Sequence, residues 1–184
     1  MSVLPAAPTN LEALNATASS FLLKWTIPFP MNTWARSYSN LVHKIAYAYK
    51  GARELADKGD PFVTAFEGVP NCPFRFFDQS HDYVCFYNLT GLEYANYLYD
   101  IRVFIKTENA SDAFWSPPAF QVKRTAPAIP PKPPRTDVGS FEVAYHMPSK
   151  DVTLYWQTLP ENLHSGANFT YKIVQVLRNN RRVE

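Results

Sequence analysis

The stretch Tyr97-Leu-Tyr-Asp-Ile-Arg-Val-Phe-Ile105 decides the fold of this chain. Every second side chain in it is large and apolar or aromatic, and a period of two is the signal of a half-buried β-strand. The intervening residues, including Arg102, are expected to face outward. The inward-facing set is predicted to fill a core between two sheets: Tyr97, Tyr99, Ile101 and Val103.

Shorter runs of the same kind lie on both sides of this stretch. They occur near Leu11 and at 21–25, 44–49, 62–69, 83–87 and 120–123, and together they predict about seven strands, as in a β-sandwich. The composition agrees, because 16 Pro against 6 Gly disfavours long helices and aromatic residues reach 15%. Only residues 48–59 favour a short helical turn. We therefore expect an all-β protein.

Several classes of function lack the residues that they need. The net charge of +2 gives no excess of basic residues for a nucleic-acid surface. The four histidines share no metal-ligand spacing with carboxylates or cysteines, and we find no Gly-rich phosphate loop or nucleophile elbow. The sequence predicts no catalytic site, no metal and no cofactor.

Cysteine and asparagine patterns indicate an extracellular setting. Cys72 and Cys85 are the only two cysteines, and an even count favours one disulfide over a zinc site, with two free buried thiols as the alternative. Neither a signal peptide nor a transmembrane run is present, so we expect an internal piece of a larger extracellular protein. Four sequons are candidate glycosylation sites: Asn15, Asn88, Asn109 and Asn168.

A proline-rich segment divides the chain. Residues 125–136 contain five prolines, which favour an extended spacer of limited flexibility. The run 20–25 on one side, ending in Trp25, resembles the run 151–156 on the other, ending in Trp156, and a second β-rich run follows at 169–176. The expected division is a module at 1–127, a linker at 128–136 and a second module at 137–184, which would be cut off after about its third strand.

Four features, in their order along the chain, resemble fibronectin type III domains. They are Pro8-Thr-Asn-Leu11, a single Trp at the end of the second strand (Trp25 and again Trp156), Leu92 ahead of the strand that begins at Tyr97, and Trp115-Ser-Pro-Pro118. The resemblance implies two immunoglobulin-like β-sandwiches in tandem, with Trp25 and Trp156 in their cores.

A narrower resemblance is to the fibronectin modules of tall class I cytokine receptors. It lies in the run from Val152 to Pro160, Gly166 and Phe169-Thr-Tyr171. In that family a Trp-Ser-x-Trp-Ser motif stacks with strand arginines, and here Trp115-Ser116 remains of it. The resemblance implies that Arg102 stacks on Trp115 as one cation–π rung. A plain fibronectin module also carries Trp-Ser-x-Pro at this place.

The segment 26–38 is a long connection between the second and third strands and is rich in aromatic residues. Binding residues concentrate on loops held by a rigid sandwich, and aromatic residues with Arg dominate interface hot spots. The alternative is that these side chains fold back as a lid on the core. The candidate ligand contacts are Phe29, Met31, Trp34, Arg36 and Tyr38.

The resemblance implies that the protein functions as a receptor on the outer face of the plasma membrane. A receptor of this kind binds a cytokine-like protein ligand, pairs with a second receptor chain and contributes to JAK/STAT-type signalling. Its parent protein would be membrane-anchored, as a single-pass type I protein with the span outside this chain. The alternative is an adhesion or guidance receptor whose modules act as spacers, because fold does not fix function.

Overall fold

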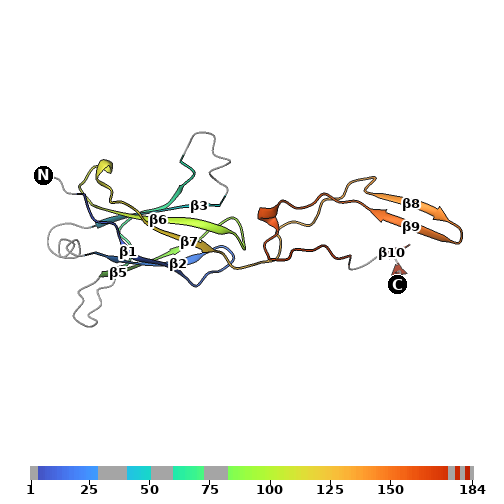
Figure 1. The fold of residues 1–184 in the computed structure, drawn as a ribbon, viewed down its shortest axis with the longest axis horizontal. Coiled ribbons are helices and arrows are strands. Elements are labelled where there is room, and N and C mark those ends of the chain that lie inside the picture. Colours follow the sequence, from blue (N-terminus) through green and yellow to red (C-terminus); the bar gives the residue numbers. More distant parts are fainter. Residues whose placement is uncertain are drawn as a thin grey trace.

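The computed structural model describes residues 4–28, 41–50, 60–72, 83–173, 177–178 and 181–182. It is built almost entirely from antiparallel strands, which confirms the all-β class (Figure 1). The two short helical turns are 3₁₀, at η1 (Asp112–Phe114) and η2 (Glu161–Leu163). The helical turn expected within 48–59 falls mostly outside the described residues, although its first two positions end a strand.

Residues before the proline-rich segment form two sheets. The first sheet has the order β1-β2-β5, from β1 (Thr9–Leu14), β2 (Phe21–Ile27) and β5 (Tyr83–Leu89). The second has the order β4-β3-β6-β7, from β4 (Val63–Gly68), β3 (Leu41–Tyr49), β6 (Leu98–Thr107) and β7 (Ala119–Arg124). Because β4 pairs with β3 rather than joining the β1 sheet, the order is that of a fibronectin type III domain rather than a constant-type immunoglobulin domain.

The core lies between these two sheets. Trp25 of β2 and Tyr99, Ile101 and Val103 of β6 are all buried, as their period of two requires. Tyr97 precedes β6 and is only half-buried against the core, because it stands at the end of the sandwich. Other members of the cluster include Leu11, Phe21, Leu23, Ile45, Leu89, Leu92 and Ile105.

A tyrosine closes the turn that leads into β6. The Tyr99 hydroxyl donates to the backbone oxygen of Tyr94 at 3.3 Å and accepts from the Tyr94 amide at 2.8 Å. This is the tyrosine-corner arrangement of immunoglobulin-like sandwiches. Burial raises the pKa of Tyr99 to about 12, so the hydroxyl keeps its proton and both hydrogen bonds.

Beyond the proline-rich segment the described strands are fewer. A hairpin pairs β8 (Phe141–His146) with β9 (Ser149–Leu154), and β10 (Leu177–Arg178) pairs with β11 (Arg181–Arg182). β8 was not predicted from the sequence, although its apolar residues alternate with smaller or polar ones. The strand expected at 169–176 is absent from its described part, 169–173, which has no regular structure.

Trp156 is a correction to the predicted core. Its side chain is 39% exposed, and the large apolar residues of β8 and β9 are exposed as well. The reason is that no second sheet packs on this hairpin within the described part of the chain. Trp156 instead contacts the ring of Tyr171, at 5.4 Å between centroids.

Candidate functional site

The aromatic loop predicted to contact a ligand lies outside the described residues. This applies to all five candidates, Phe29, Met31, Trp34, Arg36 and Tyr38. The described flanks show where the loop begins and ends: Ile27 is the last residue of β2 and Leu41 is the first of β3, and both are buried. These two flanking residues belong to different sheets.

Ser116 of the Trp115-Ser116 pair is built into the first sandwich. Its amide donates to the Ile105 oxygen at 2.9 Å, and its hydroxyl accepts from the Ile105 amide at 3.0 Å and donates to the Pro117 oxygen at 2.8 Å. The side chain thus supplies the acceptor that a paired strand would otherwise give to β6. Ser116 is 3% exposed, so its role here is structural.

Lysine side chains, rather than Arg102, flank the Trp115 ring. The Lys106 ammonium lies 4.8 Å and the Lys44 ammonium 5.8 Å from the ring centroid. By alternation Lys106 belongs to the outward-facing side of β6, yet it is buried, since Asp112 at 2.7 Å and the Ala110 oxygen at 3.2 Å also hold its ammonium. The hydrogen bond from Lys106 and its positive charge lower the pKa of Asp112.

Arg102 stacks on a different ring. Its guanidinium lies 3.6 Å from the centre of Phe62, which precedes β4. The register explains this correction, because Arg102 stands opposite Ala46 of β3, and Ala46 stands opposite Thr64 of β4. A small residue in the middle lets the long side chain cross β3 and reach Phe62, whereas Trp115 follows η1 beside the far end of β6.

These contacts lie on the outer face of the first sandwich, which is the side of the β4-β3-β6-β7 sheet opposite the core. Ala46 and Ala48 are buried there, although they point away from the core. Phe120 of β7 stands opposite Arg102 and is 53% exposed, and Val122 beside it is exposed too. Exposed aromatic and apolar groups around an arginine are typical of protein-binding surfaces.

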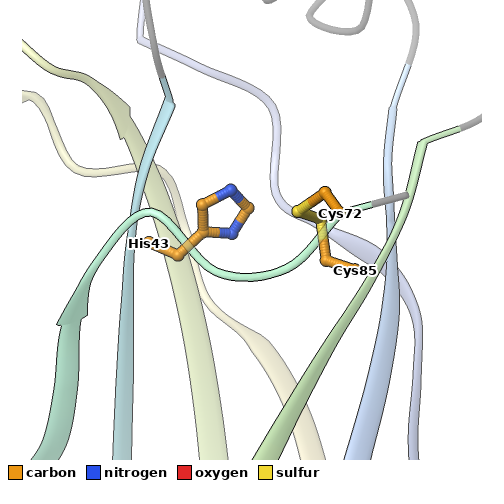
Figure 2. Close-up of side chains that lie close together, drawn as sticks. All are labelled: His43, Cys72 and Cys85. Carbon is orange, nitrogen blue, oxygen red and sulfur yellow. A yellow bond between two sulfur atoms is a disulfide. The ribbon is translucent and has the colours of Figure 1, made fainter. Parts of the chain in front are cut away.

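A second constellation surrounds His43 in the core (Figure 2). The Trp25 indole donates to His43 Nδ1 at 3.1 Å, which makes Nδ1 the acceptor of a neutral imidazole. Burial lowers the pKa of His43 to about 4, so the ring stays uncharged at neutral pH. The sequence did not single out this histidine, because its spacing from the carboxylates and cysteines matches no metal-ligand motif.

His43 lies beside a disulfide between Cys72 and Cys85. One imidazole nitrogen and the two sulfurs all lie within 4.8 Å of one another, which resembles three ligands of a metal site. Metals bind thiolates, however, and the disulfide leaves neither sulfur as a thiolate. In this oxidised form the group does not fit a metal ion, and it packs as part of the core.

The four sequon asparagines are all exposed. Asn88 lies on β5, Asn109 follows β6, and Asn15 and Asn168 have positive φ angles of 47° and 55° in turns. Exposed positions of this kind are open to a glycan. No helix in the described part of the chain is long and apolar enough to cross a membrane.

Comparison with known proteins finds a relative along almost the whole chain. No family model matches the chain. A Drosophila melanogaster protein named "Cytokine receptor" is 32% identical over 184 residues, which is 99% of this chain. The chain resembles a cytokine receptor over its whole length. The match spans 12% of the length of that relative. The resemblance to a cytokine receptor that the sequence predicted is therefore confirmed, for one segment of that receptor.

Solved structures with similar folds include two fibronectin type III domains of human proteins. One is from fibronectin type III domain containing protein 3, with 14% identity and a TM-score of 0.45 over 71% of this chain and 94% of that domain. The other is from the KIAA0970 protein, with 15% identity and a TM-score of 0.44 over 73% of this chain and 85% of that domain.

Proposed function

We propose that this chain is part of the extracellular region of a cell-surface receptor of the cytokine-receptor kind. The observation that carries the proposal is the resemblance to a cytokine receptor along 99% of the chain. The disulfide beside His43 and the four exposed sequon asparagines support an oxidising, extracellular setting. The parent protein would be a single-pass type I protein whose span lies outside this chain.

The proposed division of the chain into modules follows the strands. Residues 1–127 form one fibronectin type III module, 128–136 a linker, and 137–184 part of a second module. The amide of Asn96, which stands before β6, donates to the Ala126 oxygen, so the first sandwich holds the chain up to the linker. The amide of Ala128 then donates to the Ser165 oxygen, which ties the linker to the second part.

In this proposal a protein ligand binds the first module, and ligand-driven pairing with a second receptor chain leads to JAK/STAT-type signalling. The candidate ligand contacts in this proposal are the aromatic residues of segment 26–38 and the outer face with its exposed Phe120. A spacer function is the second candidate. The observation that favours it is the end-to-end arrangement of the two parts along the long axis of the molecule (Figure 1).

A replacement experiment in the parent receptor separates the two functions. Residues 1–184 are exchanged for two unrelated fibronectin type III modules, and cell-surface display, ligand binding and STAT phosphorylation are measured. A ligand-binding role predicts normal display with loss of binding and of phosphorylation. Normal binding and signalling after the exchange would show that the segment is a spacer.

A finer pair of variants tests the binding surfaces themselves. Trp34→Ala alters the aromatic loop, and Phe120→Ala alters the outer face. Ser19→Ala, at an exposed residue between β1 and β2 that lies outside every sequon, serves as the matched control. Loss of binding with unchanged thermal stability marks a ligand contact, whereas loss of stability marks a core residue. If all three variants bind ligand as the parent does, neither surface is the binding site.

A further inference from the structure

A polar pocket lies where the first sandwich meets the turn that follows η2. Its volume is about 750 Å³. One wall comes from the end of β3, the approach to β6 and the end of β7; the other comes from Glu161 and residues 164–169. The hydrogen bond from Ala128 to Ser165, at 2.8 Å, holds the two walls together.

Two cationic side chains line the first wall. The Lys50 amide donates to the Leu98 oxygen at 2.9 Å, and Leu98 stands opposite Arg124 in the β6–β7 register. Lys50 and Arg124 therefore flank Leu98 on either side. Arg124 Nη1 donates to the Asn96 oxygen at 2.6 Å, which directs its guanidinium toward the pocket wall. Neither cation forms a salt bridge with any residue that the structure describes.

The second wall supplies backbone donors. His164 has a right-handed helical backbone, with φ of −64°, and Ser165 follows it in the left-handed region, with φ of 57°. This succession forms a nest, in which consecutive amides point into one concavity and attract an anion. The amides of Ser165 and Gly166 donate no hydrogen bond to the described residues, although Ser165 is buried. A buried amide of this kind needs an acceptor.

We propose that this pocket binds a tetrahedral oxyanion, a sulfate or phosphate group, between the side chains of Lys50 and Arg124 and the amides of Ser165 and Gly166. Charge and hydrogen-bond donors then come from opposite walls, so a bound anion also joins the two parts of the chain. Glu161 is the acidic residue among the lining groups, and it weakens the site by repulsion.

The anion has two possible sources, a free ion and a sulfated sugar chain. The test uses the oxidised, unglycosylated 184-residue chain, labelled with ¹⁵N, and follows its amide resonances during titration with sodium sulfate or with a heparin-derived sulfated hexasaccharide. Saturable shifts of Ser165 and Gly166 support the proposal in either titration. Much tighter binding of the hexasaccharide assigns the site to a sugar chain, and equal affinity per sulfate assigns it to the free ion.

Charge variants show whether the effect belongs to this pocket. Lys50→Gln and Arg124→Gln each lower affinity at least about fivefold, and Glu161→Gln raises it about threefold. Lys24→Gln, on β2 of the other sheet, is the matched control and changes affinity less than about twofold. All four side chains are at least partly exposed, and retained amide dispersion confirms the fold.

Three outcomes overturn the proposal. They are a titration in which the Ser165 and Gly166 resonances do not move, a loss in Lys24→Gln equal to that in Arg124→Gln, and an affinity that falls or is unchanged in Glu161→Gln. The second outcome would mean that the anion responds to the overall charge of the chain rather than to this site.

Discussion

Acidification should destabilise the first sandwich through His43. The pKa of this imidazole is lowered from 6.5 to about 4 by burial, with the residue 1% exposed and Trp25 donating to Nδ1. The unfolded chain therefore binds one more proton than the folded chain between these two values. Stability from this group is fully present above pH 6.5 and is lost as the pH falls toward 4.

The magnitude follows from the two pKa values. A separation of about 2.5 units corresponds to about 3 kcal/mol once the pH is below both values, and the part lost by pH 5 is about 2 kcal/mol. Domains of this size are stable by about 5–15 kcal/mol, so such a loss is large. Cys72 and Cys85, which lie beside the ring, do not titrate while they are bonded.

Urea unfolding at pH 7 and pH 5, followed by circular dichroism, measures this loss. His43→Gln is the matched variant, since its side-chain oxygen can accept from Trp25 but does not titrate. We expect the parent to lose about 2 kcal/mol more than the variant between the two pH values. Equal losses in both proteins would refute the reasoning. If the variant fails to fold, NMR titration of His43 in the parent decides, and a pKa near 6.5 would refute it.

Three further predictions concern packing. Ser116→Ala removes the acceptor of the buried Ile105 amide and should cost about 1–3 kcal/mol in urea unfolding; an unchanged midpoint would contradict the structural role of that hydroxyl. Arg102→Ala should cost about 0.5–1 kcal/mol more than Arg102→Lys, because the lysine keeps a cation near Phe62, and equal losses would exclude the stacking contribution. Replacing both Cys72 and Cys85 by Ala should cost about 3 kcal/mol for a closed loop of this length, measured as a fall in thermal midpoint under non-reducing conditions, and a midpoint that stays fixed would argue against a stabilising disulfide.

The sequence predicted the first sandwich well because its signals are local. The alternation in β6 depends on neighbours two residues apart, so the inward positions could be assigned without knowing the partners of the strand. The same alternation could not show that Lys106 would be buried. That outcome depends on Asp112 and Trp115, which reach the strand only after the chain turns through η1.

The candidate site was less predictable because it depends on pairing between distant segments. Arg102 was assigned to Trp115 from the resemblance to cytokine-receptor modules, whereas the register with Ala46 of β3 directs it to Phe62. Likewise, nothing in the spacing of His43 and the two cysteines indicates that β3 and β5 bring them together across the core. Trp156 shows a further limit of predicting burial from residue type. A tryptophan typical of a core position is buried only where a second sheet covers it.

Two buried alanines on the outer side of β3, Ala46 and Ala48, have a consequence for how this surface tolerates substitution. Positions 46 and 48 belong to the solvent side of their strand by alternation, where most substitutions are nearly neutral. Because Ala46 and Ala48 are covered, a larger side chain at either place must displace its cover, which makes these two positions behave like interior ones. Libraries that diversify this side of the sheet for new binders should therefore keep both alanines and vary the exposed β7 positions instead.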